Sequence, residues 1–131
     1  MAYLGRDEIL QVDDLQYEDV EVPEWGGVVR VRGLTGAERD AFEESIMDQR
    51  GKKFRVLLQN LRAKLVALSI VDEAGKRLFS EGDVGKLGTK SAAALQRVFE
   101  AAQRLSGISD EDVDELVKNS SSGQSDDSIS A

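Results

Sequence analysis

The carboxylates of this sequence are the side chains that come closest to suggesting chemistry. Asp13–Asp14 and the acidic residues between Asp110 and Glu115 could chelate a hard cation such as Mg²⁺ or Ca²⁺ through their oxygens. Neither group has the ligand spacing of an EF-hand loop. Paired carboxylates could also transfer protons, but 25 acids among 131 residues make such pairs inevitable. Solvated faces and helix caps explain these groups better, so we predict no catalytic residue and no metal site.

Cysteine and histidine are both missing from the sequence, which excludes several classes of site. No disulfide, thiolate nucleophile or His-based triad can form, and a structural zinc ion would lack its usual ligands. Gly82, Gly85 and Gly88 do not make a phosphate-binding loop, because no Lys-Ser/Thr pair directly follows them. The sequence therefore predicts a protein that is not an enzyme and needs no cofactor. A small enzyme that uses carboxylates and a hard metal is the minor alternative.

The net charge of −8 disfavours a general nucleic-acid binder, because phosphates would be repelled. The charge is uneven: residues 26–64 hold nine bases and five acids, between an acidic N-terminal stretch and an acidic C-terminal stretch. Part of this basic middle forms either a solvated face or a surface that docks an acidic protein. The only aromatic residue among its bases is Phe54, so stacking on nucleic-acid bases has little support. These bases are Lys52, Lys53, Arg55, Arg62 and Lys64.

The hydropathy of the chain predicts no membrane partner. No apolar run approaches the ~20 residues needed to cross a bilayer. Met1–Leu10 carries charges and has no apolar segment of a secretory signal. The zero cysteine count fits a cytoplasmic protein. We therefore expect a globular protein that remains in the cytoplasm.

The N-terminal part of the chain predicts a β-hairpin at about residues 17–32. Tyr17–Val22 and Val28–Arg32 both alternate valine with charged residues, as half-buried strands do. The loop between them contains Pro23, which lacks a backbone donor, and a Gly pair that permits positive φ. Acids on the first strand can face Arg30 and Arg32 on the second. A short helix over Gly5–Leu15 is expected to precede the hairpin.

Helices are predicted for most of the remaining chain. Thr35 and Glu38 match a capping box that opens a helix to about Gln49. Phe54–Ser69 has the strongest helical periodicity, and a second small hairpin is expected around the turn at residues 72–76. Further helices are expected over residues 80–88, 91–106 and from 109, with Ser91 or Thr89 as a cap for the second and Gly107 after its end.

These elements together predict a mainly α fold, with four to five helices and the N-terminal hairpin in a single domain over residues 1–118. Residues 119–131 contain six Ser and a single large apolar residue, Ile129. Such a segment cannot bury enough surface to offset its chain entropy, so we predict a disordered C-terminal tail.

Seven residues make up the predicted partner-binding set. Trp25 is the only tryptophan, and it either packs on the hairpin as core or anchors an interface. The Leu stripe over residues 57–68 is expected to be mainly core, although part of it could stay accessible to an amphipathic helix. The full set is Trp25, Arg30, Arg32, Phe54, Arg55, Leu58 and Arg62.

The stretch from Val20 to Arg39 resembles the opening of the tail assembly chaperones of siphophages and related prophages. It contains the run Val22-Pro23-Glu24-Trp25-Gly26-Gly27, followed by Gly33-Leu34-Thr35-Gly36 at the start of a helix. Residues 62–69, 72–79, 94–99 and 104–107 resemble the same family in the same order. The resemblance covers roughly residues 1–118.

The resemblance implies a function in building a phage tail. Such a protein would bind the tape measure protein in the host cell cytoplasm and leave as tail tube protein subunits arrive, so it would not be part of the mature virion. The resemblance also implies that a frameshifted longer form of the chain could exist. A homo-oligomer could form through the hairpin edge. The alternative from another class is a structural virion protein, such as a head–tail connector or tail completion protein.

Overall fold

The structure is a computed structural model that describes residues 3–45, 47–48, 55–56 and 60–115. For 47–48 and 55–56 it describes the backbone only. The predicted tail over residues 119–131 lies outside the described residues, as do the predicted site residues Phe54 and Leu58.

The predicted N-terminal hairpin is confirmed. Strands β1 (Tyr17–Val22) and β2 (Gly27–Arg32) pair antiparallel, and the short 3₁₀ helix η1 (Pro23–Trp25) joins them. Gly26 follows η1 with a φ of 76°, a left-handed conformation that glycine adopts without a Cβ clash. Val20, Val22, Val29 and Val31 turn toward the core, because alternate residues of a strand share a face.

The second predicted hairpin joins the first in one sheet. Strand β5 (Ile70–Val71) pairs antiparallel with β2, so the strand order is β1-β2-β5. The chain turns back after β5, where the Asp72 N–H donates to the Lys76 carbonyl at 2.8 Å and Gly75 has a φ of 85°. Val71 forms a bridge with Arg77. The second hairpin therefore pairs with the first through the central strand β2.

The region between the predicted second and third helices differs from expectation. Helix α2 (Gly36–Ser45) ends before the predicted Gln49, because β3 (Met47–Asp48) follows and pairs with β4 (Arg55–Val56). Helix α3 (Leu61–Ser69) begins after Asn60, whose φ of 61° is left-handed and cannot lie inside an α-helix. The predicted helix from Phe54 is therefore wrong in its first part and correct from Leu61.

The C-terminal half of the described chain is helical, as predicted. Ser91 caps α5 (Ala92–Leu105) by accepting from the Ala94 N–H at 3.2 Å. Gly107, with a φ of 72°, ends it, and the Ile108 N–H reaches back to the Gln103 carbonyl at 2.9 Å. The remaining elements are η2 (Glu81–Asp83), α4 (Val84–Leu87) and a last helix over residues 110–115.

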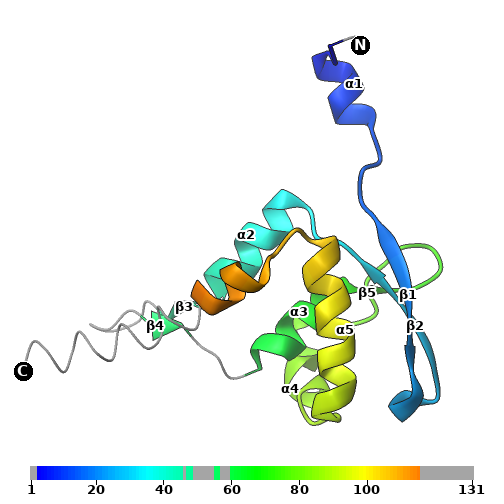
Figure 1. The fold of residues 1–131 in the computed structure, drawn as a ribbon, viewed down its shortest axis with the longest axis vertical. Coiled ribbons are helices and arrows are strands. Elements are labelled where there is room, and N and C mark those ends of the chain that lie inside the picture. Colours follow the sequence, from blue (N-terminus) through cyan, green and yellow to red (C-terminus); the bar gives the residue numbers. More distant parts are fainter. Residues whose placement is uncertain (1–2, 46, 49–54, 57–59, 116–131) are drawn as a thin grey trace, which may run out of the picture.

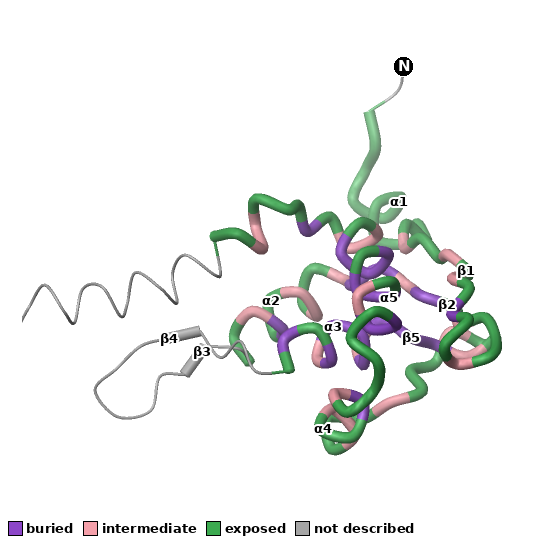
Figure 2. Tube along the Cα trace, turned by 60° about the horizontal axis from the view of Figure 1, so that its bottom comes forward, coloured by how far each residue is buried: buried purple, intermediate pink, exposed green. Residues whose placement is uncertain are grey.

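One face of the sheet carries the helices, and the core lies between the two layers. Helix α5 packs on β1, β2 and α3, as Figure 1 shows. The residues that are almost fully enclosed come from both layers, and Figure 2 shows them at the centre of the molecule. They include Val22, Val31, Leu65, Val66, Ile70 and Val98. The helices from α2 onward thus lie on one side of the three-stranded sheet, and α5 covers that face.

Helix α1 (Arg6–Gln11) is the exception, because none of its residues is buried. Figure 1 shows it beyond the end of β1, apart from the other helices. It is shorter than the predicted helix over Gly5–Leu15. No helix in the described part of the chain is long and apolar enough to cross a membrane.

Candidate docking groove

A hollow of about 350 Å³ lies between α2, α3 and the segment that follows the second hairpin. This volume is at the small end of the range for binding pockets, which run from ~300 to ~1,000 Å³. The residues that line it are Ala41, Phe42, Ser45, Lys64, Ala67, Leu68, Arg77, Phe79, Ser80, Glu81 and Val84. We call this hollow the docking groove.

Helical spacing places two sets of side chains in the groove. Ala41, Phe42 and Ser45 share one side of α2, and Lys64, Ala67 and Leu68 share one side of α3, because residues three or four apart lie on the same helical face. Phe42 and Ala67 are only 3% and 4% exposed, and both belong to the core. Phe42 and Ala67 therefore belong both to the core and to the lining of the groove.

The third side of the groove comes from the segment between β5 and α4. Phe79 and Val84 are partly buried and pack against the core, as Leu68 does on α3. Their remaining exposed apolar surface faces a space that no described side chain fills. The floor of the groove is therefore apolar and can take apolar side chains of a partner.

Charged side chains surround this apolar floor. Lys64 Nζ donates to the Ser45 carbonyl at 2.9 Å, so the lysine bridges α3 and α2 at the groove. Arg77 and Glu81 add one charge of each sign. The lining offers no cysteine or histidine, and its one carboxylate has no partner set for acid–base chemistry. This arrangement fits the binding of a partner segment.

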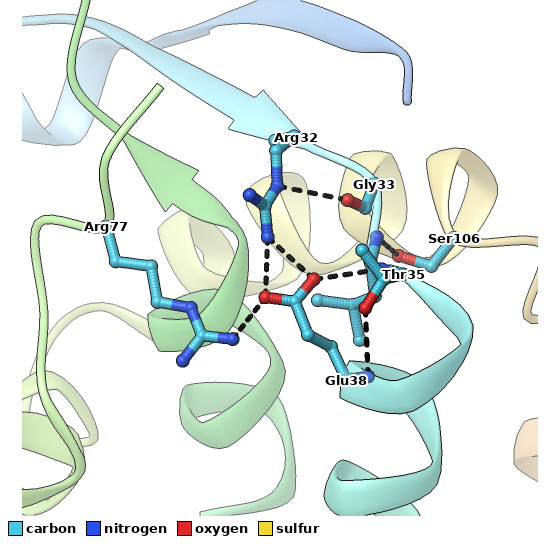
Figure 3. A network of polar contacts seen from close by, with 7 residues as sticks. Arg32, Gly33, Thr35, Glu38, Arg77 and Ser106 are labelled. Atoms are coloured by element: carbon cyan, nitrogen blue, oxygen red, sulfur yellow. Dashed lines mark hydrogen bonds and ion pairs between the residues drawn. The ribbon is translucent and has the colours of Figure 1, made fainter. Parts of the chain in front are cut away.

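Arg77 is held at the groove by an ion-pair network, which Figure 3 shows from close by. Arg32 Nη2 donates to both carboxylate oxygens of Glu38 at 2.7 Å, and Arg77 Nη2 donates to Oε2 of the same carboxylate. The predicted capping box is also present: the Thr35 N–H donates to Glu38 Oε1 at 2.9 Å, and the Glu38 N–H donates to Thr35 Oγ1 at 3.0 Å. Glu38 therefore links β2, the start of α2 and the second hairpin.

The environment of Glu38 lowers the pKa of its carboxyl group. Burial on its own raises this pKa, since it penalises the charged form. The Thr35 amide and the guanidinium groups of Arg32 and Arg77 outweigh burial by donating to the carboxylate. Glu38 is therefore held in its charged form, as a double ion pair requires.

The structure separates the predicted hairpin residues by environment. Trp25 packs against the core, and its indole Nε1 is buried with no hydrogen-bond partner among the described groups. The Arg32 side chain is only 14% exposed because of its contact with Glu38. Arg30 points away from the core and pairs with Asp19 at 3.2 Å. Of these three residues, Arg30 is the one whose charged group is open to a partner.

The predicted residues on the long helical stretch are described only in part. Arg62 lies on α3, opposite the groove side, and donates to Gln96 Oε1 at 2.5 Å. Its guanidinium carbon is 5.8 Å from the centroid of the Phe99 ring, within range of a cation–π contact. Phe54 and Leu58 lie outside the described residues, and Arg55 belongs to β4 without a described side chain. The structure therefore places Arg62 against α5 and leaves the other three residues of this stretch as predictions.

The docking groove contains residues that the sequence did not mark as a site. Phe42 and Leu68 were visible as apolar residues at helical spacing, the signal of a core face. Phe79 and Val84 had no periodic pattern that would connect them with those helices. Their meeting depends on the turn at residues 72–76, which returns the chain toward α2 and α3.

Arg30→Ala is expected to lower the free energy of unfolding by about 0.5 kcal/mol or less. The Arg30 and Asp19 side chains are 42% and 59% exposed, so water already solvates both charges. Urea unfolding of Arg30→Ala, Asp19→Ala and the double variant measures the pair energy. A coupling energy well above ~1 kcal/mol would show that the pair is stronger than its exposure implies.

Among the residues that the structure describes, no three Asp, Glu, Cys or His side chains gather where they could hold a metal ion. Comparison with known protein families matches residues 10–119 to the model of a family described as phage tail assembly chaperone. This match covers well over half of the chain. No curated protein and no solved structure matches the chain.

Proposed function

The chain belongs to the phage tail assembly chaperone family, which is not an enzyme family, and on this premise we propose that it binds the tape measure protein. In this function it keeps the long tape measure protein soluble in the host cell cytoplasm. It then helps recruit tail tube protein subunits, and it leaves as the tube closes around its client. The mature virion does not contain it.

The docking groove is the observation that carries this proposal. An amphipathic helix presents apolar anchors at positions i, i+3, i+4 and i+7, and such a helix binds by laying them into an apolar groove. The floor formed by Phe42, Leu68, Phe79 and Val84 can receive such anchors. Lys64, Arg77 and Glu81 can then meet charges that flank the apolar stripe of the client. A chaperone of a long helical protein needs this combination.

The small size of the groove suits a client that must later be released. A hollow of about 350 Å³ encloses a few side chains and not a whole helix. Most of the client would stay accessible to tube subunits, and several chaperone copies could shield successive apolar stripes. Contacts of this size belong to weak and transient interfaces.

The residues predicted from the sequence contribute to this proposal unequally. We keep Arg30 and Arg62 as secondary client contacts, because both side chains are exposed at the surface. Trp25 and Arg32 serve the fold, since the first packs on the core and the second pairs with Glu38. Phe54, Arg55 and Leu58 remain predictions that mutagenesis can test.

Ala41→Glu is expected to weaken solubilisation of the tape measure protein strongly. Ala41 is exposed on α2 and lines the groove, so a glutamate there leaves the fold intact but puts a carboxylate beside the apolar floor. Desolvating that charge against an apolar anchor is unfavourable. Co-expression with the tape measure protein, followed by pull-down, should give at least about tenfold less soluble complex, equivalent to ~1.4 kcal/mol.

The matched control is Ala93→Glu, which makes the same change at an exposed position of α5 outside the groove. It should behave as wild type. If Ala41→Glu also behaves as wild type, the groove is not the client site. If wild type itself leaves the tape measure protein insoluble and the chain is found in purified particles, the chain is a head–tail connector or tail completion protein.

A further inference from the structure

The N-terminal arm, residues 3–12, concentrates the exposed apolar surface of the described chain. Tyr3 is 100% exposed, Leu4 70%, Ile9 53%, Leu10 66% and Val12 58%. They are five of the eight large apolar residues that are exposed in the described part of the chain. A cluster of this kind marks a contact surface, whereas single exposed apolar residues are ordinary.

The arm contains local signals for the start of a helix, and these involve only its own residues. The Gly5 N–H donates to Glu8 Oε1 at 3.1 Å, as in a capping box. Leu4 and Ile9 occupy the two positions of a hydrophobic staple across this cap. A helix as short as α1 is still marginal in water, since isolated helices need ~12–15 residues. Its apolar side chains therefore need a surface to pack against.

The docking groove has the chemistry that matches the arm. The arm offers aliphatic side chains. Four acids accompany them, Asp7 and Glu8 within α1 and Asp13 and Asp14 just after it, with one base, Arg6, which pairs with Asp7. The groove offers an apolar floor and two positive charges, Lys64 and Arg77, against one negative charge, Glu81. Opposite charges around matched apolar surfaces favour this pairing over contact of the arm with the acidic strand β1, which carries Glu18, Asp19 and Glu21.

The position of the arm points to the groove of another molecule. Figure 1 shows α1 beyond the end of β1, apart from α2, α3 and α4, whose residues line the groove. Residues 3–9 of the arm also precede the stretch that the family model matches, residues 10–119. The arm therefore begins before the matched stretch and ends inside it, and it lies apart from the helices of its own groove.

We propose that the arm of one copy of this chain docks through Ile9 and Leu10 in the docking groove of a second copy. The contact is head to tail, because each copy offers an arm at one end and a groove at another. Such contacts build chains, or rings if the rotation closes. The additional consequence, which rests on the proposed function, is that the arm shields the groove until a client helix displaces it.

Sedimentation velocity over a rising concentration series tests this self-association. Wild type should show a mass that rises with concentration, whereas Leu10→Asp and Ala41→Glu should each remain monomeric. Mixing these two variants should restore a one-to-one dimer, because the first keeps an intact groove and the second an intact arm. Pairing through a hairpin edge would show no such complementation. Leu78→Asp and Ala93→Glu are the matched controls and should associate as wild type does.

The proposal is overturned if wild type is monomeric at every concentration, if Leu10→Asp associates as wild type, or if the mixed variants stay separate. Its failure is distinguishable from failure of the proposed function. Leu10→Asp keeps its groove, so it should still hold the tape measure protein soluble. If the mixed variants dimerise but wild type does not bind the tape measure protein, the arm docks as proposed and the client proposal alone fails.

Discussion

Gly33→Ala is expected to lower the free energy of unfolding by about 3 kcal/mol, at the upper end of typical overpacking effects. A Cβ atom on Gly33 would lie 2.4 Å from the Leu105 carbonyl oxygen and 3.0 Å from its carbonyl carbon. Both are backbone atoms at the end of α5, so no side-chain rotation can relieve the clash. The end of β2 and the end of α5 would have to separate.

Hydrogen bonds on both sides of Gly33 oppose this separation. The Gly33 N–H donates to the Gln16 carbonyl at 2.9 Å, and the Leu34 N–H donates to Ser106 Oγ at 3.0 Å. Moving the backbone away from α5 would stretch the second bond and expose Leu34, which is only 7% exposed. The cost therefore includes lost hydrogen bonding and lost apolar burial as well as the contact itself.

Gly36→Ala is the matched control for Gly33→Ala. A Cβ on Gly36 meets nothing within 4 Å, and this residue is the first of α2. Alanine there should leave stability unchanged or raise it by up to ~1 kcal/mol, because it restricts the unfolded chain. Urea unfolding followed by circular dichroism measures both variants. Equal stability of the two would mean that the contact of Gly33 with α5 is not as close as described.

Glu38→Ala is expected to lower the free energy of unfolding by about 3 kcal/mol, the size typical of breaking a buried ion pair. The side chains of Glu38 and Arg32 are 21% and 14% exposed, so the pair is largely removed from water. Removing the carboxylate leaves Arg32 with the Gly33 carbonyl, at 3.2 Å, as its described acceptor. The variant also loses the half of the capping box in which the Thr35 N–H donates to the Glu38 carboxylate.

The control for Glu38→Ala is Glu43→Ala. Glu43 pairs with Arg39 on the surface of α2, and its side chain is 45% exposed. That substitution should cost only about 0.3–0.5 kcal/mol, as exposed i,i+4 pairs do. If chemical denaturation shows the two variants to be equally stable, the network at Glu38 has no special role in the fold.

The pH dependence of stability tests the charge of Glu38 separately from its shape. Its pKa in the folded protein lies below the ordinary value of 4.5, so its stabilisation is fully present above about pH 4.5 and is lost as the pH falls through the folded pKa. Glu38→Gln keeps the shape and removes the titration. The stability gap between wild type and Glu38→Gln should therefore narrow below pH 4.5. A gap that stays constant would show that the charge does not contribute.

The sequence by itself determined the features that depend on neighbours within a few residues. The alternating valines predicted β1 and β2, because strand faces repeat every second residue. Thr35 with Glu38, Ser91, and Gly107 predicted helix ends, because capping joins a side chain or a left-handed residue to backbone groups within the same turn. The family resemblance came from the same local runs, and the match over residues 10–119 confirms it.

Only the tertiary structure decided the contacts between segments that are far apart in the chain. Nothing near Ile70 indicates that it will pair with Val31, or that Gly33 will touch Leu105. Glu38 was recognisable as a cap, but its ion pair with Arg77 exists because β5 and its turn return to α2. The long apolar periodicity extended the helix back to Phe54, yet the β3–β4 pairing and Asn60 set its start at Leu61.

The docking groove was likewise predictable from the sequence only in part. The sequence identified Phe42 and Leu68 as apolar residues on helical faces, since periodicity records which side of a helix avoids water. It could not show that these faces leave a hollow with Phe79 and Val84 at its other side. A groove forms where the side chains of several neighbouring elements do not fill the space between them. Its position therefore depends on how those elements pack. The residue types were therefore determined by the sequence, whereas the site was decided by packing.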